Sequence, residues 1–249
     1  MQGSLLSMYR PLLLALSFLT ALPVGGKTDY RDSDFGKSAI YFPFIGFVLG
    51  AFAFYIVELL LSLGLNTSVI AFILIVYLQI VTRGLHIDGL ADSFDGFFGG
   101  KGSEDALRIM KEPTAGPFGI TAIVIVLLGT YIALEMDIAS GNQMIIVPVL
   151  ILSRWGMALG AFKARYPREI GTGKLLIGNI SAVSIFLSTI FALLLVWLYV
   201  GMLSVYMILS TLLLVIAVRI IAKKKINGMT GDLLGTINEL VVLILLFAF

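Results

Sequence analysis

Long apolar runs, separated by short polar connections, are the feature that most constrains how this chain can fold. Of its 249 residues, 59% are hydrophobic and only 13% are charged, whereas a water-soluble domain carries roughly 25% charged residues. So few charges cannot cover a surface that faces water. The composition therefore favours a chain embedded in lipid.

A bilayer core about 30 Å thick requires roughly 20 apolar residues for each crossing helix. This spacing predicts an all-α fold, a polytopic transmembrane bundle of about seven or eight membrane helices, in a single domain over residues 1–249. The expected spans are 5–24, 39–63, 67–82, 117–136, 143–163, 181–200, 203–222 and 232–249. The first contains Pro11 and the third is short, so we expect either of them to be tilted or partly re-entrant.

Basic residues occur in every second connection. They lie in segment 25–38 (Lys27, Arg31, Lys37), in segments 83–116 and 163–180, and after Arg219, whereas the turns near Gly64, Asn142 and Gly201 carry none. Because short basic loops remain in the cytoplasm, we expect a multi-pass protein of the plasma membrane with both chain ends outside. A site built on the basic connections would face the cytoplasm.

The chain has no Cys, one His and a formal net charge of +2. Disulfides, zinc–thiolate sites and thiol nucleophiles are therefore excluded, and so is a multi-histidine metal site. The low net charge argues against nucleic acid as a partner. Any bound metal must be held by oxygen, which favours a hard divalent cation such as Mg²⁺.

Three aspartates follow the third span. If this segment is helical, Asp88, Asp92 and Asp95 lie at positions i, i+4 and i+7, on one face. Three like charges on one face repel each other unless a cation lies among them. A solvated surface helix is the plain alternative, but acidic residues at membrane level are functional by default. The spacing favours a metal site.

The last span brings two more acidic residues. Asp232, Gly235 and Glu239 share a face, and Glu239 lies about two turns inside the expected span. Asp232 is also in the place where a carboxylate stabilises a helix N-terminus. Glu239 is too deep for that role and requires a metal, a basic partner or a cavity.

Two further polar side chains need partners. Arg154 lies inside a span, where it either forms a structural salt bridge with Glu239 or Glu58 or directs a permanent cation at a substrate phosphate. His86 precedes the aspartates and is either a structural residue or a general base. The two prolines and two glycines between Pro113 and Gly119 interrupt helical structure before the fourth span. The free backbone amides at the start of that span are suited to binding an anion.

Carboxylates at the cytoplasmic mouth of a helical bundle, with basic residues nearby and no covalent nucleophile, suit metal-assisted phosphoryl transfer. An ion-coupled transporter is an alternative of a different class, because buried acids also line ion pathways. A transporter is expected to carry its charges near the midplane and to show a repeat. The charges here lie at one boundary, so the enzyme interpretation is favoured.

The segment Leu85 to Gly96 resembles the signature H-[LI]-D-G-L-A-D-x-x-D-G of the cobalamin synthase family, the adenosylcobinamide-GDP ribazoletransferases. The likeness covers nearly the whole chain. Further blocks that match in order are Phe18 to Val24, Phe42 to Gly46, Ile109 to Glu112 with Gly116 and Gly119, Ser153-Arg154, Tyr166 to Gly178, and Thr230 to Gly235 with Glu239.

The resemblance implies a reaction in which a ribose hydroxyl of α-ribazole, or of its 5′-phosphate, attacks adenosylcobinamide-GDP and releases GMP, with Mg²⁺ as cofactor. It implies metal ligands at Asp88, Asp92, Asp95, Asp232 and Glu239, and acid–base roles for His86, Asp92 and Asp95. The expected substrate contacts are Arg83, Lys111, Gly116, Gly119, Arg154 and Thr230. The expected partners are these two substrates and the lipid bilayer. Whether the protein forms a homo-oligomer is left open by the sequence.

The chain departs from the family pattern after Lys111, where Glu112-Pro113-Thr114 replaces Asp-Ser-Arg. The phosphate contact expected of that arginine then falls to Arg108 or Lys111. CDP-alcohol phosphotransferases are the next most similar family, but their D-G-x-x-A-R pattern is broken here because Asp92 stands in place of the arginine.

Overall fold

A computed structural model describes residues 2–24 and 30–249, and the regular structure in these residues is helical throughout. Lys27, one of the expected cytoplasmic basic residues, lies outside the described residues. The helices are α1 (Gln2–Leu19), α2 (Asp32–Ser38), α3 (Phe42–Ser62), α4 (Thr67–Thr82), α5 (Leu85–Gly99), α6 (Ser103–Ile109), α7 (Pro117–Ala139), α8 (Ile146–Ala161), α9 (Ala182–Val200), α10 (Leu203–Ile226) and α11 (Gly231–Ala248). Three 3₁₀ segments complete them: η1 (Ala39–Tyr41), η2 (Gln143–Ile145) and η3 (Thr172–Leu175).

The all-α prediction is confirmed, and the expected spans agree with the helices from residue 39 onward. Among the described residues, six helices are long and apolar enough to cross a membrane, and a seventh crossing results if the bent pair α4 and α5 is counted as one span. The pair bends by 86°. Arg83 and Gly84 make this bend because both adopt left-handed backbone conformations, with φ of 55° and 66°. The short third span is therefore a single helix, α4, that ends at a sharp bend into α5.

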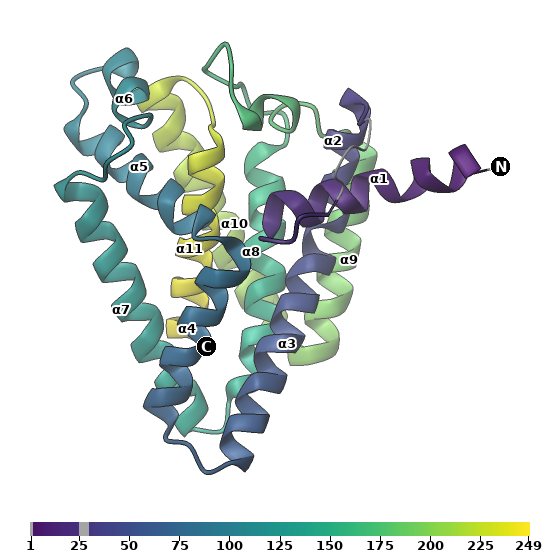
Figure 1. The fold of residues 1–249 in the computed structure, drawn as a ribbon, viewed down its shortest axis with the longest axis vertical. Coiled ribbons are helices and arrows are strands. Elements are labelled where there is room, and N and C mark those ends of the chain that lie inside the picture. The colour runs from purple at the N-terminus through teal and green to yellow at the C-terminus, as the bar shows by residue number, and fades with distance from the viewer. Residues whose placement is uncertain (1, 25–29) are drawn as a thin grey trace.

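The first expected span, 5–24, is the exception. Figure 1 shows α1 lying across the long axis of the bundle, whereas α3 and α7 to α11 follow it. The end of α1 packs beside the α4–α5 bend, where Ala21 N donates a hydrogen bond to Val81 O at 2.6 Å. Figure 1 places α1 toward the end of the bundle that carries the basic loops, and the side of the membrane on which the chain starts stays a prediction.

Helix α8 lies at the centre of the bundle, and every residue of it except Leu159 is buried. Gly46 and Gly50, one helical turn apart, explain how α3 approaches it. A Cβ on Gly46 would meet the backbone of Leu150, and one on Gly50 would lie 2.8 Å from Val147 Cα. Two backbones can come so close only without side chains between them.

The basic and bare connections separate to opposite ends of the bundle, as the sequence predicts. At one end, Lys225 Nζ donates to Phe97 O at 2.7 Å, and Met229 N donates to Arg165 O at 2.8 Å. At the other end, Asn142 Nδ2 donates to the carbonyl of Phe249 at 3.3 Å. The loops that carry the predicted site are thereby joined at the basic end.

Candidate active site

The two acidic segments meet where α5 crosses the start of α11. A Cβ on Gly89 would lie 2.8 Å from Asp232 Cα, and one on Gly235 would lie 3.0 Å from His86 Cα. Thr236 Oγ1 donates to Gly89 O at 3.3 Å across the same contact. The expected convergence of segments 88–95 and 232–239 is therefore confirmed at the Asp88–Asp232 end.

Asp88 and Asp92 border this contact. Asp88 is exposed and Asp92 is half-buried. The charges that act on Asp92 are the carboxylates of Asp88, Asp95 and Asp232, opposed by the guanidinium of Arg168. An excess of negative charge at a partly buried site favours the binding of a cation.

Arg168 is a site residue that the sequence analysis did not single out. Its Nη2 lies 3.0 Å from Asp232 Oδ2, and the two side chains are only 11% and 23% exposed. The residue lies in the loop between α8 and α9, where no periodicity indicates which side chains face inward. The only available signals were its positive charge and the unpaired Asp232.

Asp95 is oriented away from this contact, toward the first turn of α7. Its carboxylate accepts hydrogen bonds from Gly116 N at 2.7 Å and Gly119 N at 2.9 Å. These are amides that the sequence predicted to bind an anion, and in the structure they donate to a carboxylate of the protein itself. Both glycines are explained as well, because a Cβ on either one would collide with the Asp95 carboxylate. Metal and acid–base roles for Asp95 stay predictions.

Asp95→Ala is expected to lower the free energy of unfolding by about 2 kcal/mol or more, because two helix-terminal amides lose their acceptor in a buried place. The measurement is the thermal unfolding midpoint of the purified protein in detergent. Asp105→Ala is the matched control, because Asp105 also accepts an amide hydrogen bond, from Lys101 N, but in an exposed turn. Equal midpoints for the two variants would contradict a structural role for Asp95.

Glu239 lines a small chamber between α4, α7, α8 and α11. Arg154 is the opposing charge, and Asn238 Nδ2 donates to Glu239 Oε1 at 3.1 Å. Gln79 and Thr82 also line the chamber, whose volume is about 20 Å³, enough for about one water molecule. The described residues include no ion pair within 4.0 Å for Arg154, and Glu58 instead accepts from Gln143. Glu239 therefore lies apart from the aspartates.

The remaining predicted residues divide between buried and exposed positions. His86 is 1% exposed and Thr230 is fully buried, where its hydroxyl accepts from Leu233 N at the start of α11. Arg154 is also 1% exposed. Arg83 is exposed at the α4–α5 bend, and Lys111 is exposed in the loop after α6.

A surface cavity of about 730 Å³ adjoins the acidic contact through Arg168. Its other charged lining residues are the basic Arg108 and Lys111 and the acidic Glu104, Glu112 and Glu169. Arg108 is already engaged, at 2.6 Å, by both Asp105 and Glu112. Arg168 is paired with Asp232, so Lys111 is the basic lining residue that forms no ion pair in the described part of the chain. The volume of the cavity is that of a small-molecule site.

The magnesium site stays a prediction. In the part of the chain that the structure describes, no three carboxylate or imidazole groups lie close enough together to hold a metal ion. The donors at the α5–α11 contact are nevertheless carboxylate oxygens, which suit Mg²⁺. This ion is commonly held by one or two carboxylates together with substrate phosphates, rather than by an all-protein cage.

Comparison with known proteins identifies the family. Adenosylcobinamide-GDP ribazoletransferases of Clostridium botulinum and Clostridioides difficile are each 33% identical to this chain, of which the alignments cover 94%, with 94% and 96% of the relatives covered. The enzyme of that name from Prosthecochloris aestuarii is 35% identical over 92% of both chains. No solved structure matches this chain.

The profile of the cobalamin-5-phosphate synthase family matches residues 11–249, nearly the whole length. Together with the helical bundle and the apposed aspartates of α5 and α11, this match shows that the chain belongs to the cobalamin-5-phosphate synthase family, enzymes that act as transferases in cobalamin biosynthesis.

Proposed function

We propose that this protein catalyses the adenosylcobinamide-GDP ribazoletransferase reaction. The observation that carries the proposal is the apposition of Asp88 and Asp92 with Asp232, beside the cavity that Arg168 lines. Acidic groups next to a cavity that presents Lys111 and Arg168 suit a diphosphate whose charge is shared between a metal ion and basic side chains. The names of the relatives supply the substrate.

In the proposed step, a ribose hydroxyl oxygen of α-ribazole, or of its 5′-phosphate, attacks the cobinamide-side phosphorus of adenosylcobinamide-GDP. A new P–O bond forms, the bond from that phosphorus to the bridging oxygen breaks, and GMP leaves with the bridging oxygen. Asp92 is the proposed acceptor of the hydroxyl proton, because it is half-buried and lies beside both Asp88 and Asp232. His86 is buried. The acid–base role predicted for it therefore requires a route through the protein along which the proton reaches the substrate.

One or two of the carboxylates Asp88, Asp92 and Asp232 would hold Mg²⁺, with the substrate phosphates completing its coordination. The ion would neutralise charge on the diphosphate and on the departing GMP. Asp95 and Glu239 support this site from outside it in the proposal, one by holding the start of α7 and the other by opposing Arg154.

The diphosphate is proposed to enter the cavity lined by Lys111 and Arg168. Lys111 is a mobile point charge on an exposed loop, while Arg168 is anchored to Asp232 and offers the planar donor geometry that phosphate oxygens accept. By the distribution of basic loops, this end of the bundle faces the cytoplasm at the plasma membrane.

The reaction is tested by incubating the purified protein with adenosylcobinamide-GDP, α-ribazole and Mg²⁺ and by separating nucleotides from corrinoids. We expect GMP and adenosylcobalamin to appear in equal amounts, and α-ribazole 5′-phosphate to give the phosphorylated product. If the folded protein releases no GMP with either acceptor, the proposal is refuted. A transporter would give this result.

Metal removal is expected to lower activity at least about tenfold, because the repulsion among the aspartates and the diphosphate then has no counter-ion. After treatment with EDTA, Mg²⁺ should restore GMP release and Zn²⁺ should not, because Zn²⁺ prefers four nitrogen or sulfur ligands and the site offers only oxygens. Full activity in the presence of excess EDTA would contradict a metal-dependent mechanism.

A further inference from the structure

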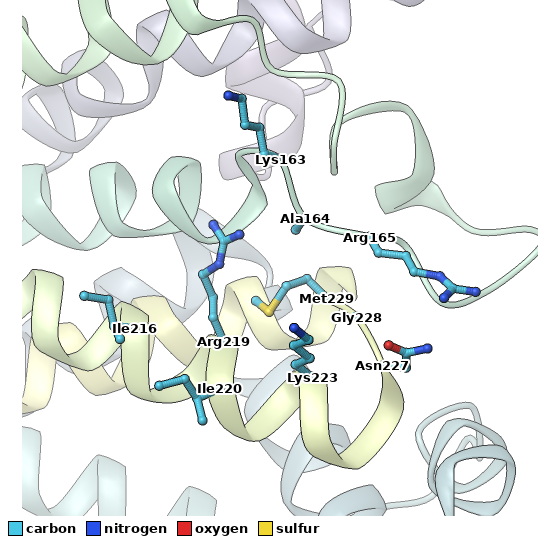
Figure 2. A pocket seen from close by; sticks show the side chains of 10 residues that line it. All are labelled: Lys163, Ala164, Arg165, Ile216, Arg219, Ile220, Lys223, Asn227, Gly228 and Met229. Carbon is cyan, nitrogen blue, oxygen red and sulfur yellow. The ribbon is translucent and has the colours of Figure 1, made fainter.

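A basic cavity, distinct from the one that Arg168 lines, lies beside the α10–α11 turn. It has a volume of about 490 Å³ and is bounded by the segment that follows α8, the last three turns of α10 and the α10–α11 turn. Four of its lining residues are cationic, namely Lys163, Arg165, Arg219 and Lys223, and none is acidic. Figure 2 shows Arg219 reaching from α10 toward the segment that carries Lys163 and Arg165.

Arg219 has partners within the protein. Its Nη1 donates to the carbonyls of Leu159 and Phe162, both at 2.8 Å, where a cation stabilises the C-terminal end of α8. Lys163, Arg165 and Lys223 form no ion pair with any carboxylate in the described ranges 2–24 and 30–249. Lys163 Nζ lies over the ring of Phe162, 5.3 Å from its centroid, and all three side chains are exposed. Their combined positive charge attracts an anion to the cavity.

The wall of the cavity changes from apolar to cationic along α10. Ile216 and Ile220 are 53% and 50% exposed, and they lie on a helix apolar enough to cross a membrane. Arg219 and Lys223 follow one turn further along, on the same side. A phospholipid at the membrane boundary has this profile, with acyl chains below and a charged phosphate above.

We propose that this cavity binds an anionic phospholipid, with its headgroup phosphate among Lys163, Arg165 and Lys223 and an acyl chain along Ile216 and Ile220. A soluble phosphate would leave the two isoleucines unused, and a zwitterionic lipid would not offset the net positive charge.

The cavity frame is firmly tied to the candidate active site. Met229 N donates to Arg165 O at 2.8 Å, and a Cβ on Gly228 would collide with the same carbonyl. Arg165 precedes Arg168 by three residues and Met229 precedes Asp232 by three, so a bound lipid braces both segments that meet in the Arg168–Asp232 pair.

The test is native mass spectrometry of the full chain, purified in detergent, with phosphatidylglycerol, with phosphatidylcholine of the same acyl chains, or with glycerol phosphate. The wild type is expected to retain phosphatidylglycerol at least tenfold more strongly than phosphatidylcholine. Glycerol phosphate at millimolar concentration should not displace the bound lipid. Equal retention of the two lipids, or displacement by glycerol phosphate, would overturn the proposal.

The triple variant Lys163→Gln, Arg165→Gln, Lys223→Gln should lose the preference, by about fivefold for each cation removed. The matched control removes three exposed cations elsewhere at the same end, Lys37→Gln, Lys101→Gln and Lys224→Gln, and should keep it. If the triple variant does not fold, Lys223→Gln alone, on an exposed helix surface, should show the fivefold loss. If the triple variant or Lys223→Gln retains phosphatidylglycerol as strongly as the control variant does, the assignment is refuted.

Discussion

Asp92→Asn is expected to lower kcat for GMP release by about a thousandfold or more while the protein stays folded in the membrane. Asparagine keeps the shape of the side chain, so packing is preserved. It removes both the proposed proton acceptor and a ligand charge for the metal, and losses of about 10²- to 10⁴-fold accompany the removal of a single acid–base group. The measurement is single-turnover formation of GMP.

The control is Asp32→Asn, which neutralises an exposed carboxylate at the start of α2, at the same end of the bundle. Its activity should stay within about threefold of the wild type, because an exposed charge remote from the reacting atoms is screened. An Asp92→Asn protein that turns over like Asp32→Asn would leave the acidic contact without a catalytic role.

Much of the fold follows from one-dimensional patterns. Apolar length predicts the helices α3, α4 and α7 to α11. The orientation of α1 does not follow, because length decides only whether a helix can cross a bilayer. Packing decides whether it does, and Phe18 stacks on Phe42 with ring centroids 5.9 Å apart, which holds α1 across α3.

The acidic stripe shows where spacing stops being informative. Asp88 and Asp95 share a helical face, but seven residues also separate them by about 10 Å along the axis. Over that distance the neighbour of α5 changes from α11 to the first turn of α7, so Asp95 meets amides rather than Asp232. A spacing rule predicts a shared face and carries no information about which element packs against it.

Arg168 and Glu239 illustrate the same limit for partners that are distant in sequence. Arg168 pairs with Asp232 from an irregular loop, and Glu239 opposes Arg154 from a neighbouring helix. The sequence indicates that each charge needs a partner, because unpaired charges are unfavourable in such places. Only the assembled bundle identifies the partner, since several candidates of the right sign exist on other elements.

Gly89→Ala is expected to lower kcat/KM about a hundredfold, although it adds one methyl group and removes no chemical function. The added Cβ would lie 2.7 Å from Asp232 O and 2.8 Å from Asp232 Cα. Both are backbone atoms, so no side chain can rotate to make room and the two helices must move apart. Displacing reacting groups by about 1 Å costs about 10²-fold in rate, and here the displacement separates Asp88 and Asp92 from Asp232.

Two glycine variants distinguish this effect from general damage. Gly50→Ala creates the same kind of collision, 2.8 Å from Val147 Cα, but between α3 and α8. It should lower the thermal unfolding midpoint as Gly89→Ala does, by an overpacking cost of about 1–3 kcal/mol, yet keep the activity of each folded molecule. Gly102→Ala meets no heavy atom within 4 Å and should change neither quantity. If Gly89→Ala and Gly50→Ala lose stability equally and both retain activity, catalysis does not depend on the α5–α11 contact.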